Sequence, residues 1–299
     1  MRVSVIIPTY NYAQFVTEAI DSVLSQTRLP HEVIVVDDGS TDDTRERVIR
    51  YGDRVRYIFQ ENRGLSAARN AGLAAATGDV FALLDSDDAF HPRKLEFQVA
   101  YLEANPTVGL VGTRTFSDAS LRWPKLDTPL ASTLPLEAHV IRTLFCQSSA
   151  LFRRTLQENI GDFDRAVSGS ADRDYWIRAA AASRVAVLQS PLTFYRLHAG
   201  SMNRNAVMMI AHEKAVLDQS FAMPELRHRF FLRRRAYGLA ALSAAYMLLQ
   251  DAGRSRAAAV SCLKSFLYFP LPFRKSETRI RLVRLRLGIR IALSVLTFR

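Results

Sequence analysis

Three carboxylates crowd at the end of one apolar segment of the chain. Residues 80–84, Val-Phe-Ala-Leu-Leu, form an unbroken apolar run, and Asp85, Asp87 and Asp88 follow it. Such a run is typical of a strand buried on both faces of a parallel sheet. Acids crowded at its carboxyl end repel one another unless a cation or donors hold them, and Mg2+ and Mn2+ prefer oxygen ligands. The cluster therefore indicates a divalent-cation site; the alternative is a turn whose acids cap the helix expected near Pro92.

A second acidic pair ends the strand expected at residues 32–37. Asp37 and Asp38 lie at that strand end, whereas Asp42 and Asp43 fall in the first turn of the next expected helix and are interpreted as structural. Ligands of open α/β sheets bind outside the carboxyl ends of the strands. If the first strand of the chain lies inside the sheet, the two acidic pairs flank one site, which predicts a metal-bound nucleotide there.

Residues 1–113 alternate between strand-like and helix-like segments. Strands are expected at 3–8, 32–37, 55–60, 80–85 and 108–113, and helices at 15–24, 42–51, 65–76 and after Pro92. Glycine after a helix and proline at a helix start are the expected punctuation. The order predicts the fold class: an α/β protein with a Rossmann-like, mostly parallel sheet and helices on both faces.

The turn after the first strand, Pro8-Thr9-Tyr10-Asn11-Tyr12, contains no glycine. Neither a G-x-G-x-x-G fingerprint nor a G-K-[ST] phosphate loop is present. Tyr10 offers a ring on which a base could stack, or it merely covers the sheet edge. In the helix expected at 65–76, Asn70 is a candidate for a ligand contact, and Arg69 suits an ion pair with a neighbouring acid as well as it suits a ligand.

The positive charge of the chain is concentrated near its C-terminus. Residues 227–299 hold 16 lysines and arginines against two acids, a net charge of +14, while residues 1–226 carry −3, which together give +11. The longest uncharged run there, 236–250, is shorter than the roughly 20 residues that span a bilayer. Basic and apolar residues side by side suit an anionic membrane surface; the alternative is a solvated basic helical cap. Nucleic acid is not an expected partner, because no aromatic platform or recognition motif accompanies the charge.

Two helices are expected in this basic region, at 236–250 and 254–269, joined as a hairpin. Beyond them, the arginines between 279 and 290 fall on two sides of a helix, which predicts no clean amphipathic face. Cys146 and Cys262 match no zinc or disulfide spacing and are expected to be unpaired thiols in a reducing cytosol. The chain enters a strand directly after Met1-Arg2, so no secretory leader is expected.

Four segments together resemble the family 2 glycosyltransferases of GT-A fold. They are VSVIIPTYN at 3–11, EVIVVDDGSTDDT at 32–44, ENRGLSAARNAG at 61–72 and DVFALLDSDD at 79–88. The resemblance implies an inverting enzyme that uses a nucleotide-sugar donor and a divalent cation, Mn2+ or Mg2+. The family's D-x-D motif matches Asp85-Ser86-Asp87, which implies that Asp87 ligates the cation with Asp85 close to it. It also implies a nucleotide-sugar site formed by Pro8, Thr9, Tyr10, Asp37, Asp38, Gly64, Asn70, Asp85 and Ser86.

The resemblance continues to about residue 205. Residues 146–153 and 160–164 are similar to acceptor-side segments of the family, and A-D-R-D-Y-W-I-R at 171–178 stands where the family has E-D-x-D-L-W-x-R. Asp172 matches the family's catalytic base. The family's glutamate is Ala171 here, a departure that bears on acceptor choice and on the position of the base.

Two more residues have alternative interpretations. Asp174 either fixes this segment or forms a structural ion pair with Arg178 at i,i+4. The segment 194–201 resembles the family's Y-R-x-H-x-x-S, which implies that His198 is a metal ligand beside Asp85 and Asp87 or a donor to the diphosphate. Without the family, a single histidine in a loop is a hydrogen-bonded surface residue.

The expected function is transfer of a sugar from a nucleoside diphosphate to a glycan or lipid-linked acceptor in bacterial surface polysaccharide synthesis. The expected domains are a GT-A domain at 1–205, with a nucleotide-binding half at 1–113 and an acceptor half at 114–205, and a basic helical extension at 206–299. The expected location is the cytoplasm, peripheral on the inner face of the cell membrane. Two alternatives are a nucleotidyltransferase, which would want a glycine-rich phosphate loop, and a membrane-associated scaffold that keeps the fold without the chemistry, suggested by Ala171.

Overall fold

The computed structural model describes residues 1–117, 123, 130–198, 206–250, 254–273, 278 and 283–297, with side chains as far as residue 292. The chain divides into two compact units, Met1–Leu136 with Leu144–Ala199, and Glu137–Thr143 with Gly200–Arg299. The expected domain boundary, between residues 205 and 206, lies at the end of a segment, 199–205, that is outside the described residues. Ser201, the turn at 251–253, Arg279 and Arg281 also lie outside the described residues.

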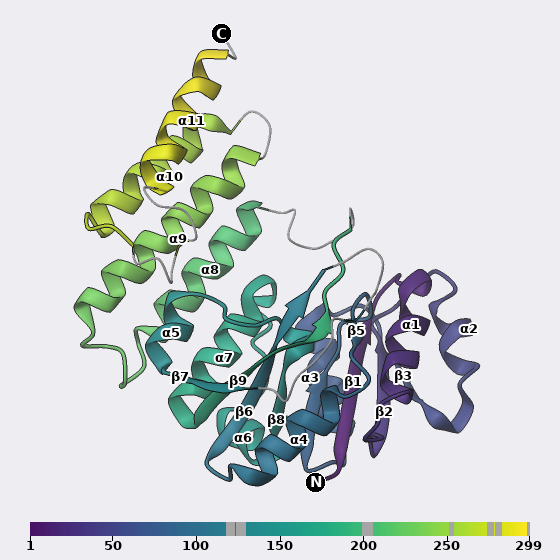
Figure 1. The fold of residues 1–299 in the computed structure, drawn as a ribbon. Coiled ribbons are helices and arrows are strands. Elements are labelled where there is room, and N and C mark those ends of the chain that lie inside the picture. Colours follow the sequence, from purple (N-terminus) through teal and green to yellow (C-terminus); the bar gives the residue numbers. More distant parts are fainter. Residues whose placement is uncertain are drawn as a thin grey trace. The chain divides into compact units, whose positions relative to one another are not determined.

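The first unit is built on a nine-stranded sheet in the order β3-β2-β1-β4-β8-β6-β9-β5, with β7 paired to β9 (Figure 1). The strands are β1 Val3–Thr9, β2 Glu32–Asp37, β3 Arg56–Phe59, β4 Val80–Leu83, β5 Ala89–Phe90, β6 Val108–Phe116, β7 Ala131–Leu134, β8 Leu151–Arg153 and β9 Arg184–Phe194. Strands β1 to β4 pair in parallel, as do β6 and β9. The pairings of β8 with β4 and β6, and of β5 and β7 with β9, are antiparallel. The predicted α/β sheet is confirmed, but the sheet is mixed beyond β4.

Strand β1 lies inside the sheet between β2 and β4, which explains why nearly all residues of the three strands are buried and most are apolar. Thr9 is in register with Asp37, and Ile6 is in register with Leu83. Because the three strands run in the same direction, their carboxyl ends meet at one edge of the sheet. The acids that follow β2 and β4 therefore lie on either side of the end of β1, as predicted.

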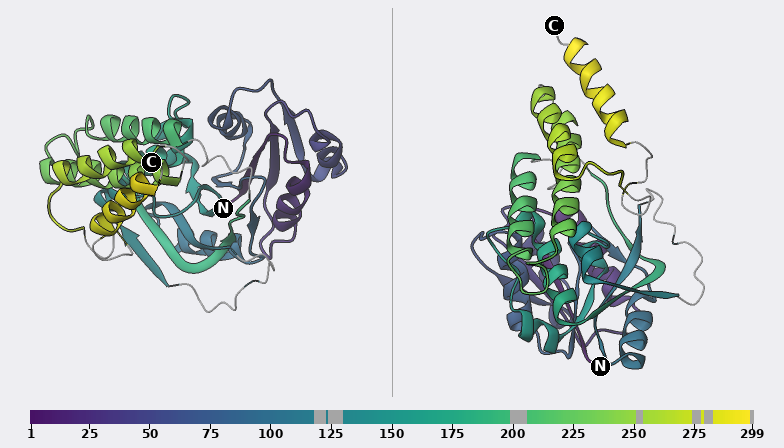
Figure 2. Two further views of the ribbon diagram at one scale, coloured as in Figure 1. Left: turned by 90° about the horizontal axis from the view of Figure 1, so that it is seen from above. Right: turned by 90° about the vertical axis from the view of Figure 1, so that its left-hand side faces the viewer.

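Helices cover both faces of this sheet (Figures 1 and 2). Alternate residues of β1 point to opposite faces: Val5 packs in one core cluster with residues of α1 (Ala13–Leu24), α2 (Thr44–Ile49) and α4 (Lys94–Ala104). Ile6 packs in the other, with residues of α3 (Leu65–Ala75), α6 (Arg154–Ile160) and α7 (Ala171–Ala182). A Cβ on Gly72 would lie 2.3 Å from Cγ2 of Ile6, so the glycine lets α3 pack this close to the sheet.

The second unit is helical. Its helices are α8 Ala206–Ser220, α9 Phe230–Gln250, α10 Ser255–Tyr268 and α11 Val283–Thr297, with α5 Leu136–Ile141 grouped largely with them. The predicted helical pair is confirmed, although α9 begins at Phe230 rather than at Ala236. Small residues such as Gly238 and Ala258 are buried where α9 and α10 pack together. No helix in the described part of the chain is long and apolar enough to cross a membrane.

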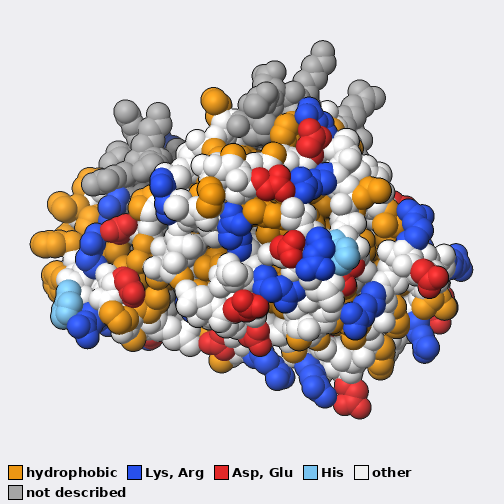
Figure 3. Space-filling model, turned by 90° about the horizontal axis from the view of Figure 1, so that it is seen from below, with side chains coloured by type: hydrophobic (Ala, Val, Ile, Leu, Met, Phe, Trp, Pro, Cys, Tyr) orange, Lys and Arg blue, Asp and Glu red, His pale blue; other side chains and the backbone are white. Residues whose placement is uncertain are grey.

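The surface drawn in Figure 3 carries both signs of charge. Acidic and basic side chains are interspersed among those coloured there, without a broad patch of one sign. Exposed ion pairs such as Arg2 with Asp79 and Arg93 with Glu96 contribute little stability individually.

Candidate active site

The acids that follow β2 are held by several donors of the protein itself. Asp38 is buried; its Oδ1 accepts hydrogen bonds from Gln60 Nε2 at 2.6 Å and from Arg63 N at 2.9 Å, and its Oδ2 accepts one from Gly64 N at 2.8 Å. Gly64 has φ 87°, a conformation that favours glycine, and stands immediately before α3. Asp38 therefore fixes the loop that leads into α3.

Asp37 is equally well satisfied. Its Oδ1 accepts a hydrogen bond from Ser40 N at 2.8 Å, and its Oδ2 accepts one from the Tyr57 hydroxyl at 2.7 Å. Burial and the bond to Asp37 raise the pKa of Tyr57. Both oxygens of the Asp37 carboxylate thus accept hydrogen bonds from the protein.

The turn after β1 presents polar groups beside these two acids. The Thr9 hydroxyl is buried and has no hydrogen-bond partner among the described residues, and Pro8 before it lies in β1. The Tyr10 ring is 47% exposed. Asn11, at φ 54°, accepts a hydrogen bond from Thr41 N at 2.8 Å, which joins this turn to the loop after β2. An exposed ring and an unsatisfied hydroxyl suit a ligand at the end of β1.

The acids that follow β4 have different partners. Asp85 Oδ1 accepts from the buried guanidinium of Arg69 at 2.8 Å, so Arg69 forms the ion pair that was one of its two interpretations. Asp87 Oδ2 lies 2.9 Å from Nε2 of His198. Ser86, between the two acids, is buried.

Asp88 serves a structural purpose. Its Oδ2 accepts from the Ser148 hydroxyl at 2.5 Å and its Oδ1 from Arg196 N at 3.0 Å. The Arg196 side chain donates to the Asp87 carbonyl at 2.8 Å and forms an ion pair with Glu18 at 2.7 Å. These contacts join the acidic segment to the segment that carries His198.

The charges of this second group are not fully compensated. Burial, together with the charge of Asp85, raises the pKa of Asp87. Burial and the charges of Asp85 and Asp87 raise the pKa of Asp88 well above its usual range. The free energy of ionising this cluster would fall if a cation bound beside it.

The residues present fit a divalent cation of the Mg2+ or Mn2+ class. No group of three acids, histidines or cysteines in the described part of the chain is arranged to hold a metal ion by itself. Such cations are commonly held by one or two carboxylates together with substrate phosphates and water. Asp87 offers a carboxylate oxygen with a raised pKa, and His198 is in contact with it. Asp85 is the further acid, with one oxygen paired to Arg69.

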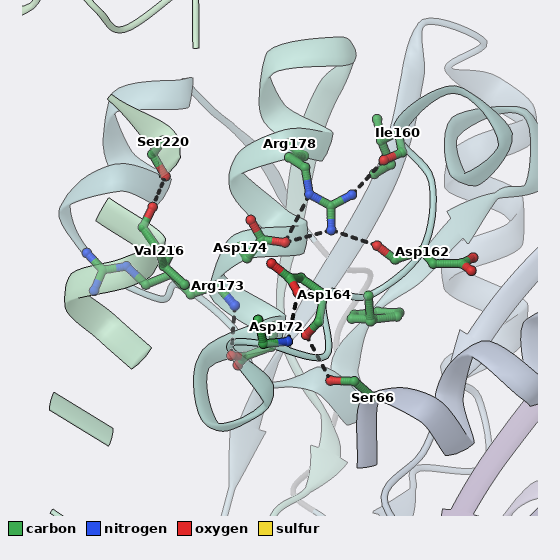
Figure 4. Close-up of polar contacts among 12 residues, drawn as sticks. Ser66, Ile160, Asp162, Asp164, Asp172, Arg173, Asp174, Arg178, Val216 and Ser220 are labelled. Carbon is green, nitrogen blue, oxygen red and sulfur yellow. Dashed lines mark hydrogen bonds and ion pairs between the residues drawn. The ribbon is translucent and has the colours of Figure 1, made fainter. Parts of the chain in front are cut away.

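Asp172 lies in the first turn of α7 and is half-buried. Its Oδ1 accepts a hydrogen bond from Arg173 N at 2.7 Å (Figure 4). Burial raises its pKa; the positive charge of Arg69 opposes the rise and the charge of Asp85 adds to it. Asp172 therefore shares an electrostatic environment with the Arg69–Asp85 pair. Ala171 is buried in the core, where an apolar side chain fits.

Helix α3 is bonded to the segment that leads to α7. Asn70 Nδ2 donates to the Phe163 carbonyl, and Phe163 N donates to Asn70 Oδ1, both at 2.9 Å. The Ser66 hydroxyl donates to the Asp164 carbonyl at 3.2 Å. Both ends of the Asn70 amide are thus bonded to the protein backbone, which supports a positioning role; its contact with the nucleotide sugar stays a prediction.

The predicted ion pair within α7 is confirmed. Arg178 contacts Asp174 Oδ2 through Nε at 2.9 Å and a terminal nitrogen at 2.6 Å. The same guanidinium donates to the carbonyls of Ile160, at 2.6 Å, and Asp162, at 2.9 Å (Figure 4). A planar donor of this kind holds several acceptors at once. It fixes the start of α7 and hence the position of Asp172.

Two positioning groups were not identified from the sequence. Ser148, in a segment interpreted as acceptor-side, accepts from Asp85 N at 3.1 Å as well as donating to Asp88. Arg196 was noted only as part of the histidine motif. Neither spacing nor residue type reveals such contacts, because they depend on the antiparallel return of β8 and β9 beside β4 and β5.

Known glycosyltransferases are similar to this chain in sequence. Residues 4–161 match the family model described as glycosyl transferase family 2. An uncharacterized glycosyltransferase of Nostoc sp. is 34% identical over 80% of this chain and 78% of its own length. One of Rickettsia felis is 35% identical over 66% of this chain, but that match spans only 34% of the longer relative.

Solved structures share the fold. Residues 1–349 of S. aureus TarS superpose with a TM-score of 0.69 at 18% identity, over 100% of this chain and 92% of that one. The mannosyltransferase PcManGT of Pyrobaculum calidifontis, solved with GDP-Man and Mn2+, superposes with a TM-score of 0.60 at 25% identity, over 99% of this chain and 87% of that one. The family match and the relatives together establish that the chain belongs to glycosyltransferase family 2.

Proposed function

We propose that this glycosyltransferase moves a sugar, with inversion, from a nucleoside diphosphate to a hydroxyl of a glycan or lipid-linked acceptor, and that it depends on a divalent cation. The observation that carries the proposal is the position of Arg69. Its guanidinium bonds Asp85 at 2.8 Å, and its charge is the largest influence that lowers the pKa of Asp172. The buried guanidinium of Arg69 thus interacts both with Asp85, on the side of the sugar donor, and with Asp172, the proposed base.

Asp172 is the proposed general base. Its carboxylate takes the proton of the acceptor hydroxyl while the hydroxyl oxygen attacks C1 of the sugar, and the bond from C1 to the diphosphate oxygen breaks. Attack opposite the leaving group inverts C1 with one carboxylate and no covalent intermediate. A raised pKa suits this role, because a base works best when its pKa approaches the working pH.

The donor is assigned to the edge formed by β1, β2 and β4. Tyr10 would stack on the base, Thr9 would use its unsatisfied hydroxyl, and Asp37 and Asp38 would hold the nucleoside. Asp87, with His198 and Asp85, would hold the cation. When bound, that cation would neutralise charge on the leaving diphosphate.

A chelation experiment tests the cation. Turnover of UDP-, GDP- and dTDP-sugars, measured as release of the nucleoside diphosphate, should vanish in EDTA and return with Mn2+ or Mg2+. A thermal-shift series with the same sugars should show stabilisation by one nucleotide class only when the cation is present, since a ligand stabilises the state that it binds. Full turnover in chelator would overturn the metal assignment.

The basic C-terminal region is the remaining part of the proposal. Residues 227–299, with a net charge of +14, would hold the enzyme on the inner face of a bacterial cell membrane. Lipid-linked acceptors of surface polysaccharide synthesis would be concentrated there.

A further inference from the structure

The second unit carries an apolar surface that its own core does not use. On α10, Ala258, Cys262 and Ser265 are buried, whereas Val260, Leu263 and Leu267 are exposed, the last by 66%. Residues three and four apart share one face of a helix. Helix α10 therefore packs through a face of small residues and presents a face of large apolar residues to solvent.

The exposed apolar surface extends to α9. Phe231, in the first turn of that helix, is 79% exposed, and Phe230 is exposed beside it. Arg234, one turn further on, donates from Nε to the Tyr268 carbonyl and from a terminal nitrogen to the Leu267 carbonyl, both at 2.8 Å. These bonds hold the start of α9 against the end of α10, as the antiparallel helices of Figure 1 show. The open end of the hairpin, where α9 begins and α10 ends, is called the hairpin tip below. Its apolar surface is formed by Phe230, Phe231, Leu263, Leu267 and Leu271.

Basic residues outnumber acidic ones beside the hairpin tip. Neither α9 nor α10 contains an acidic residue, while Arg233, Arg234 and Lys264 lie within or next to the tip. Asp218 of α8 lies beside α9, but it is paired with Lys214 and accepts a hydrogen bond from the Tyr237 hydroxyl. A second copy of the chain would bring the same cations against these, which opposes self-association. An anionic lipid surface offers the opposite charge and an apolar layer within reach of the side chains.

Helix α11 repeats the arrangement. Leu285 and Ile289 are exposed, with Arg286 and Arg290 exposed next to them. Arg284, which the sequence grouped with these arginines, is instead buried and donates to Ser265 Oγ at 3.0 Å. Arg284 thus lies on the buried side of α11 and Arg286 and Arg290 on its exposed side, so the described arginines fall on two sides of the helix, as expected.

We infer that the hairpin tip inserts into the interface of an anionic bilayer, with Phe231 and Leu267 entering the apolar layer and Lys264 contacting the lipid phosphates. This inference rests on the membrane part of the proposed function and names the surface responsible. The α11 face adds a second contact of the same chemistry.

Flotation of the full chain with vesicles tests the inference. The unaltered protein should float with vesicles of phosphatidylglycerol and phosphatidylcholine and not with phosphatidylcholine alone. The pair Phe231→Ser with Leu267→Ser should lower partitioning by about tenfold or more, because large apolar side chains supply the insertion. Lys264→Gln should lower it by about fivefold. The control pair Leu29→Ser with Ile49→Ser, also at exposed apolar positions but in the first unit, should float like the unaltered chain.

A second measurement keeps a large apolar side chain at the tip and so does not depend on a loss of membrane binding. The chain already holds Trp123 and Trp176, so Phe231→Trp is compared with the unaltered chain, and brominated lipids in the anionic vesicles should quench a larger share of its emission. Equal quenching of the two floated proteins, or equal flotation of the serine pair and the unaltered chain, would overturn the assignment of the tip.

Two further outcomes separate the rival explanations. Absence of any flotation would remove the membrane from the proposed function as well. If the unaltered chain sediments as a dimer and the serine pair as a monomer, the tip would instead be an interface between two copies of the chain. Turnover of the donor sugar in solution should be the same for the serine pair and the unaltered chain, so failure of the catalytic proposal would be seen independently.

Discussion

The acids after β2 and those after β4 look alike in sequence and differ in what holds them. Asp38 accepts three hydrogen bonds from neutral donors, two of them backbone N–H groups. Asp87 is half-buried beside another acid, and its pKa is raised. Donors of the protein satisfy Asp38, whereas the charge of Asp87 is only partly compensated, which is the feature on which the proposed cation site rests. Substitutions in the two groups of acids should therefore differ in their effects.

Asp87→Asn should have the largest effect on activity. Loss of the carboxylate should lower donor turnover by about 10³-fold or more, because cation-assisted stabilisation of the leaving group is lost. Unfolding in urea should show no loss of stability, since the variant no longer ionises a half-buried acid beside Asp85. Asp53→Asn, at an exposed turn, is the control. Turnover close to that of the unaltered enzyme would place the cation elsewhere.

The pH dependence should report Asp172. Its raised pKa means that kcat/KM falls about tenfold per pH unit as the pH drops through that pKa, above the value of about 4 for an ordinary aspartate. Arg69→Gln removes the positive charge that opposes the rise, so the acid limb should move to higher pH. Identical limbs near pH 4 in both proteins would show that Arg69 and Asp172 do not interact.

Asp172 should also make the free energy of unfolding depend on pH. Because the folded pKa of Asp172 is raised, its favourable contribution is present below the ordinary aspartate range and is lost as the pH rises through the folded value. Asp172→Asn abolishes this titration. Urea unfolding of the two proteins should therefore give a difference that shifts in favour of the variant as the pH rises through that window. A difference independent of pH would argue against a raised pKa.

Asp38→Asn should act mainly on stability. An amide places an N–H group opposite one of the three donors, so the free energy of unfolding should fall by about 1–3 kcal/mol. The neighbouring exposed Asp43→Asn should stay within about 0.5 kcal/mol of the unaltered chain. Equal stabilities for the two variants would remove the contrast between the acid groups.

Tyr57→Phe should have the smallest effect. It removes one hydrogen bond to Asp37 while Ser40 N remains bonded, so the expected loss is about 0.5–1.5 kcal/mol. Turnover of the donor should change little, and urea unfolding measures the difference.

The sequence predicts the sheet edge formed by β1, β2 and β4 well because the information there is local. Apolar runs ending in acids identify β2 and β4, and the rule for open sheets places their ends on either side of β1. The ion pair of Asp174 with Arg178 is local too, since the two residues are one helical turn apart.

The remainder depends on contacts between distant segments. Strand β8 has three residues and β5 has two, too few for a periodic pattern, yet they bring Ser148 and Arg196 to Asp88. Asn70 is a candidate for a ligand contact through its polar type and the family resemblance, and neither feature reveals that its amide is bonded to the Phe163 backbone, 93 residues away. The start of α9 was missed because Phe230 to Arg235 has no core-facing periodicity, and its first turn is exposed.

The most direct test of the account compares donor binding with donor turnover in Asp172→Asn. Calorimetry with the nucleoside diphosphate and Mn2+ should give the same affinity as the unaltered chain, while turnover falls by about 10²–10⁴-fold. Turnover that survives the substitution, or an affinity that falls together with it, would contradict the separation of a cation-binding donor side from a base held at the start of α7.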